Sequence, residues 1–475
     1  TRYWRDWSSD VCSSDLLIII FFVIGYACIA MEHPIKINKT ASALLTGVIC
    51  WTLFVLSPPT TDVIESTSFK TYLQHLELDE GVQKITEISD EIYRGFVTTQ
   101  LGEHLNSISQ ILFFLMGAMT IVELVDSHHG FRFITDRIST RNPKTLLWIV
   151  AWVSFFLSSV LDNLTTTIVM ISLIRKLIPD KDMRLFFAGI IVIAANAGGA
   201  WTPIGDVTTT MLWIGGQISS GNIIVTLFLP SVACLLVPLV YLSYTLKGTL
   251  GDIDASTSEK GKMLSTSKLM LFLGVGALVF VPIFKTVTHL PPFVGMLMGL
   301  GVLWVVSELI NPEADEIAKK NYTAAGALSR IDVPSVLFFL GILMAVSALE
   351  SMQLLHHLAT WLDQSIGDQR IIITLIGMLS AIVDNVPLVA ASMGMYNMDV
   401  YYQDHMIWEY LAYCAGTGGS ILIIGSAAGV AAMGLEKIDF IWYAKKISLL
   451  ALLGYAAGAI VYMIVAPIFA VHPPQ

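Results

Sequence analysis

Charged side chains are scarce in this sequence. Asp, Glu, Lys and Arg make up 13% of its 475 residues, whereas a soluble domain carries about a quarter. Hydrophobic residues reach 55%, and the mean hydropathy is +0.71. One globular core cannot bury so much apolar surface, so we expect lipid to be the first partner of this chain. The composition predicts an all-α polytopic membrane protein.

Motifs of enzymes and cofactor sites are also missing. The five cysteines are scattered and form no CxxC pair, which is typical of small buried side chains. No GxxxxGK[ST] loop is present, so the sequence does not support ATP-driven transport by this chain. The HExxH and GxGD motifs of intramembrane proteases are absent too. We therefore expect no enzyme activity, no cofactor and no nucleic-acid partner.

Long apolar runs predict ten membrane crossings, because a stretch of about 20 such residues can span the bilayer as a helix. They lie near residues 16–30, 40–56, 105–125, 185–215, 223–246, 269–287, 292–309, 334–350, 406–433 and 447–469. Two further apolar segments, 145–178 and 371–396, are too short for two crossings each. We predict that both are re-entrant hairpins, whose irregular tips must be buried in protein or line a cavity.

Basic residues gather in one set of loops, as expected for the cytoplasmic side of a membrane protein. These loops are 32–39, 126–144, 175–184, 247–267, 311–330 and 436–446. The opposite loops, 57–100 and 397–409, are acidic or lack Lys and Arg. The pattern predicts a multi-pass protein of the bacterial inner membrane, with a cytoplasmic linker at 247–267. The polar run 1–15 has no initiating Met, and we expect it to be truncated or non-native.

The two halves of the chain share sequence motifs. LSSVLDNL at 157–164 matches LSAIVDNV at 379–386, an offset of 222 residues. GGAWTPIG at 198–205 matches GGSILIIG at 418–425, an offset of 220. Each half has five crossings and one hairpin, and five is odd, so the second repeat (268–475) must be inverted relative to the first (16–246). Inverted repeats with broken helices, here 185–215 and 406–433, are a transporter design.

The two hairpins carry the same polar motif inside apolar sequence. An ionisable residue at such a place is costly and points to function. Each Asp is followed by Asn and preceded at four residues by Ser, so on a helix the Ser and Asp share a face. The candidate ligands for a cation or proton are Asp162, Asn163, Ser158, Asp384, Asn385 and Ser380, with Na⁺ bound at the two Asp-Asn pairs. Either Asp could instead cap a helix at the hairpin turn, and both roles can coexist.

The broken helices add further candidates. Asp206 and Thr202 flank the first break, and the counterpart of Asp206 in the second repeat is Ser426. This difference suggests that the first half carries an extra titratable group, although Asp206 could also be a helix cap. Glycine allows a helix break and a close approach of backbones. The glycines expected to do so are Gly198, Gly199, Gly418 and Gly419.

Four motifs together resemble the NhaD-type sodium/proton antiporters of the ion transporter superfamily, whose relatives include arsenite and dicarboxylate carriers. They are SSVLDNLTTT (158–167), NAGGAWTPIGDVTTT (196–210), SAIVDNVPLVAA (380–391) and GTGGSILIIGSAAG (416–429). The resemblance covers nearly everything after Leu16. It implies exchange of cytoplasmic Na⁺ or Li⁺ for external protons, with hairpins and broken helices forming the ion sites. It also implies a transport domain that moves against a scaffold domain, and a possible homodimer.

The expected mechanism is competition between a cation and a proton for a buried carboxylate. Removal from water favours the neutral acid, and a bare charge is costly to carry across the membrane. The alternative is a proton- or sodium-coupled carrier of anions such as arsenite or dicarboxylates. Its site needs a cationic or hydroxyl-rich pocket, and no Lys or Arg falls in the hairpins or breaks. A passive channel also stays open, although inverted hairpins argue against it.

Overall fold

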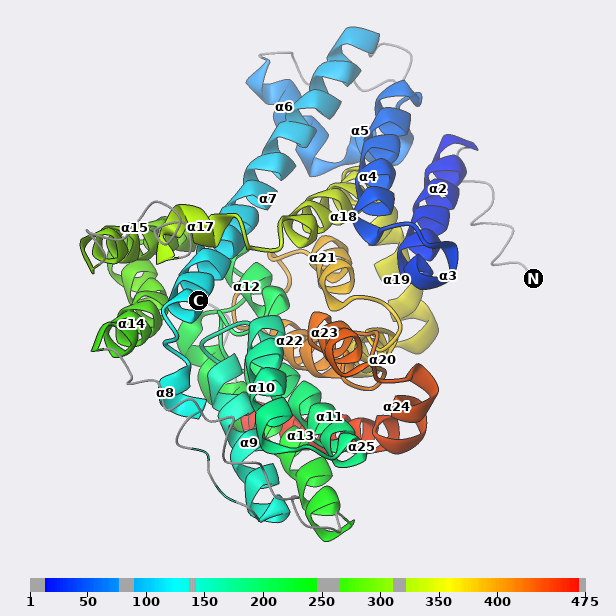
Figure 1. Ribbon diagram of the computed structural model, residues 1–475. Coiled ribbons are helices and arrows are strands. Elements are labelled where there is room, and N and C mark those ends of the chain that lie inside the picture. The colour runs from blue at the N-terminus through cyan, green and yellow to red at the C-terminus, as the bar shows by residue number, and fades with distance from the viewer. Residues whose placement is uncertain are drawn as a thin grey trace. The chain divides into compact units, whose positions relative to one another are not determined.

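The computed structural model describes residues 13–76, 89–135, 142–245, 265–310 and 322–469, together with Ile138 and Thr140. Throughout these ranges the regular structure is helical (Figure 1), which confirms the predicted all-α fold. The expectation for residues 1–12, and the linker as far as residue 264, lie outside the described residues.

Eight helices in the described ranges are long and apolar enough to cross a membrane. They are Lys39–Leu56, Asp90–Ser127, Lys181–Gly199, Ser220–Thr245, Thr266–Thr288, Pro292–Ile310, Val333–Ser351 and Ser448–Phe469. The remaining two predicted crossings correspond to shorter helices. One is the apolar stretch Asp15–Ile29 of helix α2 (Ser13–Ala30), and the other is divided into α22 (Met406–Gly418) and α23 (Ala427–Glu436). The chain is a polytopic membrane protein.

The described residues form two compact units. The first is built from parts of 1–112, 333–367 and 390–400. Its helices are α2, α3 (Glu32–Ile35), α4 (Lys39–Leu56), α5 (Thr61–Glu65), α6 (Thr67–His75), the start of α7 (Asp90–Ser127), α18 (Val333–Ser351), α19 (Leu354–Ile366) and the end of α21 (Asn385–Met395).

Helices α4 and α18 approach each other closely within this first unit. A Cβ atom on Gly47 would lie 2.6 Å from the carbonyl oxygen of Gly341, so a larger residue would force the backbones apart. The Trp51 indole donates to the carbonyl of Met344 at 2.9 Å. Small residues at a crossing, supported by a hydrogen bond, are how membrane helices associate when the hydrophobic effect between them is weak.

The second unit is built from parts of 113–332, 368–389 and 401–475. It contains the end of α7, the start of α21, and the whole of α22 and α23. Its other helices are α8 (Arg132–Thr135), α9 (Pro143–Ser158), α10 (Asn163–Leu177), α11 (Lys181–Gly199), α12 (Val207–Ile214), α13 (Ser220–Thr245), α14 (Ser265–Thr288), α15 (Pro292–Ile310), α17 (Ala324–Leu328), α20 (Gln369–Leu379), α24 (Phe440–Lys446) and α25 (Ser448–Phe469). Both predicted hairpins begin in this unit, and both broken helices lie within it.

Short helices occupy the two segments expected to be hairpins. The first pair, α9 and α10, has 16 and 15 residues, and the second pair, α20 and α21, has 11 each. At 1.5 Å per residue the helices are roughly 16 to 24 Å long, less than the ~30 Å of a hydrocarbon core. The broken helices are interrupted between α11 and α12 and between α22 and α23. Entry of the hairpins from opposite faces, and inversion of the repeat, stay predictions.

Several parts of the chain are more helical than the sequence pattern indicated, and the two longest of them are the start of α7 and helix α19. Helix α7 begins at Asp90, well before the predicted start of that crossing at residue 105. Asp90 and Glu91 in its first turn interact favourably with the helix dipole, so a polar sequence still begins a stable helix. Helix α19 was not expected either. It is amphipathic and only partly buried, which a search for long apolar runs does not detect.

Candidate functional site

Helix α11 lies at the centre of the second unit. Every residue from Phe187 to Gly199 is buried, and α9, α10, α13, α22 and α23 all contact this helix. A helix that is covered on all sides needs no polar face. A polar residue inside it, such as Asn196, therefore requires specific partners.

Each hairpin docks on a broken helix through a glycine. A Cβ atom on Gly198 would collide with the carbonyl of Phe155, and one on Gly418 would collide with the carbonyl of Gly377. The Ser158 hydroxyl donates to the carbonyl of Ala195 at 2.6 Å. Ser380 makes the corresponding bond to Ala415 at 3.0 Å. The two halves of the chain thus use matched contacts to hold the hairpin tip against the break.

The Asp206 carboxylate is the most deeply buried acid at these breaks, with 2% of the residue exposed. One oxygen accepts from the side-chain amide of Asn163 at 2.7 Å. The other accepts from the backbone N–H and the hydroxyl of Thr208 at 2.9 and 2.8 Å, and from the amide of Asn385 at 3.4 Å. Among the described residues, every hydrogen-bond partner of this carboxylate is neutral.

Asn196 joins the two repeats. Its amide oxygen accepts from Asn163 at 3.0 Å. Its amide nitrogen donates to the hydroxyls of Ser420 and Ser426, both at 2.9 Å. Asn163, Asn196 and Asp206 come from the first repeat, whereas Asn385, Ser420 and Ser426 come from the second. Polar side chains of both repeats therefore form one buried hydrogen-bonded network.

The two hairpin aspartates lie beside this network and are half-buried. Asp162 caps α10: its carboxylate accepts from the backbone N–H of Thr165 at 2.7 Å and from the Thr165 hydroxyl at 2.6 Å. Asp384 accepts from the backbone N–H of Val386 at 3.5 Å. Both carboxylates are close enough to repel that of Asp206 when all are charged. Asp162 thus has the capping role that the sequence left open, at a place where it also contributes charge to the site.

The remaining candidates hold the backbone around the breaks. The Thr202 hydroxyl donates to the carbonyl of Ser159 at 2.7 Å. A Cβ atom on Gly199 would collide with the carbonyl of Gly205, and one on Gly419 would lie 2.8 Å from that of Gly425. In the part of the chain that the structure describes, Gly216 and Gly367 are the glycines with positive φ. Close approach, rather than a left-handed conformation, therefore requires glycine at the breaks.

Helix ends of both kinds surround the network. The N-terminal ends of α10, α12 and α23 are capped by Asp162, Asp206 and Ser426, so part of the acidic charge offsets helix dipoles. The C-terminal ends of α9, α11, α20 and α22 lie at the same breaks, and the last carbonyls of a helix lack intrahelical partners. No Lys or Arg occurs at residues 145–174, 185–246 or 371–436. The arrangement offers oxygen atoms and negative charge, which suit a small cation.

The sequence pattern did not single out Asn196, Thr208 or Ser420 as site residues. Asn196 carried a detectable signal, because it is a polar residue within a long apolar run, as Asp162 is. Thr208 and Ser420 gave weaker signals, since threonine and serine are common in membrane helices, where they bond to their own backbone. The partners of Asn196 and Ser420 come from other helices and became evident only in the folded chain, whereas Thr208 bonds to Asp206, two residues before it.

A bundle of membrane helices, several of them interrupted at a shared buried polar site, defines a secondary transporter. Residues 26–412 match a family model described as "Citrate transporter". Sodium/proton antiporter 1 of Arabidopsis thaliana is 49% identical over 95% of this chain and 73% of its own length, and sodium/proton antiporter 2 is 44% identical over 94% and 98%. The Na⁺/H⁺ antiporter NhaD of Vibrio cholerae is 30% identical over 94% and 91%. The chain belongs to this transporter family, among the NhaD-type sodium/proton antiporters, and is not an enzyme.

Proposed function

We propose that this chain exchanges Na⁺ or Li⁺ for protons, with both ions competing for a site centred on Asp206. The observation that carries the proposal is a carboxylate with 2% exposure whose described partners are all neutral. The names of the relatives agree with it, because those from Arabidopsis and Vibrio cholerae are called sodium/proton antiporters.

The coupling follows from the cost of a bare charge. A buried carboxylate that lacks a cationic partner is destabilising, and a bound proton or a bound Na⁺ each removes that cost. The carboxylate cannot hold both ions fully at once. If the site can move its opening from one side of the membrane to the other only when the carboxylate is neutralised, it must carry Na⁺ in one direction and a proton in the other. The fluxes of Na⁺ and protons would then be linked.

Asp162 and Asp384 add charge and oxygen ligands on either side of Asp206, and the amides of Asn163 and Asn385 complete the proposed Na⁺ site. Both amides direct nitrogen toward Asp206. Na⁺ prefers oxygen, so we propose that these amides turn their oxygens toward the ion when it binds. Hydroxyl oxygens of Ser158, Ser380 and Thr202 keep lone pairs for the same purpose, because their hydrogens bond to carbonyls.

An anion carrier is the second candidate, since the family model is described as a citrate transporter and helix N-termini can bind anions. At this site the N-termini of α10 and α12 are already occupied by Asp162 and Asp206. A dicarboxylate would therefore meet carboxylates without a Lys or Arg nearby in sequence. Proton movement driven by citrate or arsenite, with no response to Na⁺, would favour the anion carrier.

The membrane in which this chain works can also be inferred. We propose the inner membrane of a bacterium, where a proton gradient can drive the exchange, and a homodimer as the assembled form. The relatives from Arabidopsis make a plant membrane the rival location. Fractionation of cells that express a tagged chain distinguishes the membranes. The mass of the purified protein, corrected for bound detergent, tests the dimer.

The direct functional test is proton flux in proteoliposomes. The chain should dissipate an imposed pH gradient when NaCl or LiCl is added, but not when choline chloride is added. Asp206→Asn should reduce the Na⁺-dependent flux to the level of empty liposomes. Asp182→Asn, a change at an exposed residue of α11, should leave it unchanged. Full exchange by Asp206→Asn would remove this residue from the centre of the site.

A further inference from the structure

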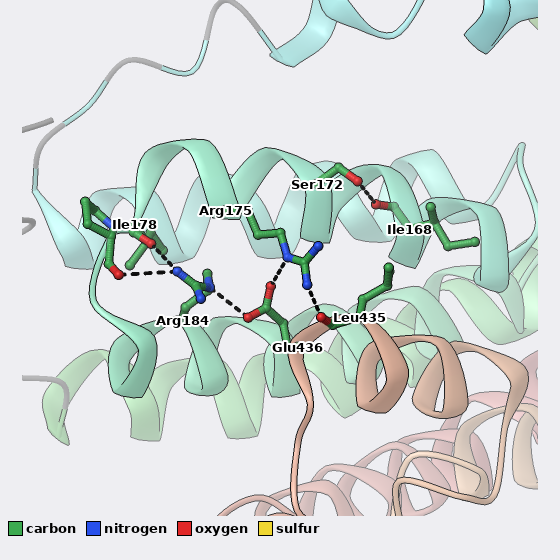
Figure 2. Close-up of polar contacts among 8 residues, drawn as sticks. Ile168, Ser172, Arg175, Ile178, Arg184, Leu435 and Glu436 are labelled. Atoms are coloured by element: carbon green, nitrogen blue, oxygen red, sulfur yellow. Dashed lines mark hydrogen bonds and ion pairs between the residues drawn. The ribbon is translucent and has the colours of Figure 1, made fainter. Parts of the chain in front are cut away.

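A buried ion cluster lies away from the site, between α10, α11 and α23. Glu436 at the end of α23 has 1% of its side chain exposed. It accepts from Nε of Arg175 at 2.6 Å through one oxygen and from Nε of Arg184 at 2.7 Å through the other. Figure 2 shows the two guanidinium groups approaching this carboxylate from two sides. The proposed ion exchange does not use this cluster.

Both arginines are also tied to backbone at helix ends. Arg175 donates to the carbonyl of Leu435, and Arg184 donates to the carbonyl of Ile178 at 2.9 Å (Figure 2). The carbonyls at the C-terminal end of a helix carry a partial negative charge and lack intrahelical partners. The cluster therefore fastens the end of α10, the beginning of α11 and the end of α23 to one another.

The same three helices carry part of the proposed ion site at their opposite ends. Arg175 lies 12 residues after Asn163 on α10, Arg184 lies 12 residues before Asn196, and Glu436 lies 10 residues after Ser426. At 1.5 Å per residue these spacings are about 18, 18 and 15 Å. The three helices contact one another pairwise. They thus form three struts of similar length, joined by the amide–hydroxyl network at one end and by the ion cluster at the other.

We infer that Glu436 is a positioning residue for ion binding: its two ion pairs hold α10, α11 and α23 in register, so that Asn163, Asn196 and Ser426 stay at the spacing that the ion requires. The inference rests on the proposed function and extends it. Small shifts of a rigid helix at one end move groups at its other end. Loss of the cluster should therefore lower the affinity for Na⁺ and change the selectivity between Na⁺ and Li⁺. It should not lower the maximal flux of the transporter.

A chemical reason favours this role for a charged group. A buried carboxylate held by two guanidinium groups fixes both distance and direction, because each Nε–H must point at one oxygen. Such clusters often add little net stability, since desolvation offsets the attraction, yet loss of one member leaves the others unpaired. Their specific geometry suits the control of helix register better than it suits general stabilisation.

The test compares Glu436→Gln with Arg330→Gln. Arg330 pairs with Glu123 at 2.5 Å elsewhere in the same unit, so its removal is a matched loss of an ion pair away from the three struts. In proteoliposomes, with flux scaled to folded protein, Glu436→Gln should raise the Na⁺ concentration for half-maximal flux roughly three- to tenfold and change the ratio of Na⁺ to Li⁺ affinity. Its maximal flux should stay within about twofold of wild type. Arg330→Gln should change neither affinity.

A double variant separates positioning from damage. Glu436→Gln combined with Arg184→Gln leaves no unpaired partner between those two positions, and its shift in Na⁺ affinity should be smaller than the product of the two single shifts. If Glu436→Gln does not fold, Arg175→Gln removes only one of the two ion pairs, that of a half-exposed side chain. It should raise the Na⁺ concentration for half-maximal flux by a smaller factor. Unchanged ion affinities in folded variants, or a loss of maximal flux alone, would overturn the inference while exchange by the wild type persists. A wild type without Na⁺-dependent flux would instead overturn the proposed function.

Discussion

At the scale of single residues, the distribution of polar groups departs from a simple pair of equivalent sites. Asp206 is more deeply buried than the half-buried Asp162 and Asp384. Its counterpart Ser426 has no charge, although it occupies the same position at the other break and also caps its helix, α23. The two halves of the chain thus have similar contacts at their breaks, whereas the titratable group at the break is present in only one of them.

Asn196 should be as important for binding as the acids, because it bonds to Asn163 in the first half of the chain and to Ser420 and Ser426 in the second. We expect Asn196→Leu to remove three hydrogen bonds and to leave buried partners unsatisfied, which costs about 1–3 kcal/mol for each such group. The variant should lose more than about tenfold in Na⁺ affinity, since 1.4 kcal/mol is a factor of ten. Flux against NaCl concentration in proteoliposomes measures it.

The matched control is Asn106→Leu, which changes the same residue type at an exposed position of α7. It should retain wild-type affinity. An Asn196→Leu variant with wild-type affinity would show that the bridge between the repeats is dispensable for binding.

Much of this site could be predicted from single residues of the sequence, because polar residues are rare and costly where lipid is the solvent. In a membrane segment a lone Asp or Asn is costly, so Asp162, Asp206 and Asp384 could be singled out without a structure. Their ranking could not be predicted, because burial depends on how the hairpin tip docks. Nor could the cluster at Glu436, since acids near loops are usually solvated.

At the scale of elements, glycine at the docking points determines how closely hairpin and broken helix approach. Gly198 and Gly418 each face a carbonyl of the hairpin, and a Cβ atom at either would overlap that backbone group. Backbone cannot yield as a flexible side chain can. These positions therefore fix the distance between the hairpin tip and the break.

We expect Gly418→Ala to push α20 away from α22 and to disrupt the second break, at a cost of about 1–3 kcal/mol or more for overpacking. The folded variant should show a lower temperature of half-unfolding in detergent and a lower Na⁺-dependent flux than wild type. Gly434→Ala is the control, because nothing lies within 4 Å of a Cβ atom placed there, and it is also on a helix of the second repeat. A Gly418→Ala variant as stable and active as Gly434→Ala would argue against the close docking.

The elements also show where sequence patterns fail. The interruptions between α11 and α12 and between α22 and α23 follow from glycine and polar motifs within apolar runs, and such motifs can be read from the sequence. The polar start of α7 and the amphipathic helix α19 could not be predicted from the sequence, because their helical order depends on capping and on partial burial against neighbours. Apolar length predicts membrane spans well and predicts amphipathic or polar helices poorly.

At the scale of the whole molecule, the described chain divides into two compact units, and the polar network lies entirely within the second. The first unit contains the close α4–α18 pair and no residue of the proposed ion site. A division of roles, in which the second unit binds the ion and the first serves as scaffold, stays a prediction. The relative movement of the units stays a prediction.

If Na⁺ and a proton compete for one buried carboxylate, binding of Na⁺ must release protons, and this release can be measured. Purified protein in weakly buffered detergent solution is mixed with NaCl, with choline chloride as the control for ionic strength, and the pH is followed with an indicator. Wild type should release up to about one proton per bound Na⁺, and Asp206→Asn should release none. Saturable Na⁺ binding by the wild type without proton release, or undiminished release by Asp206→Asn, would contradict this competition.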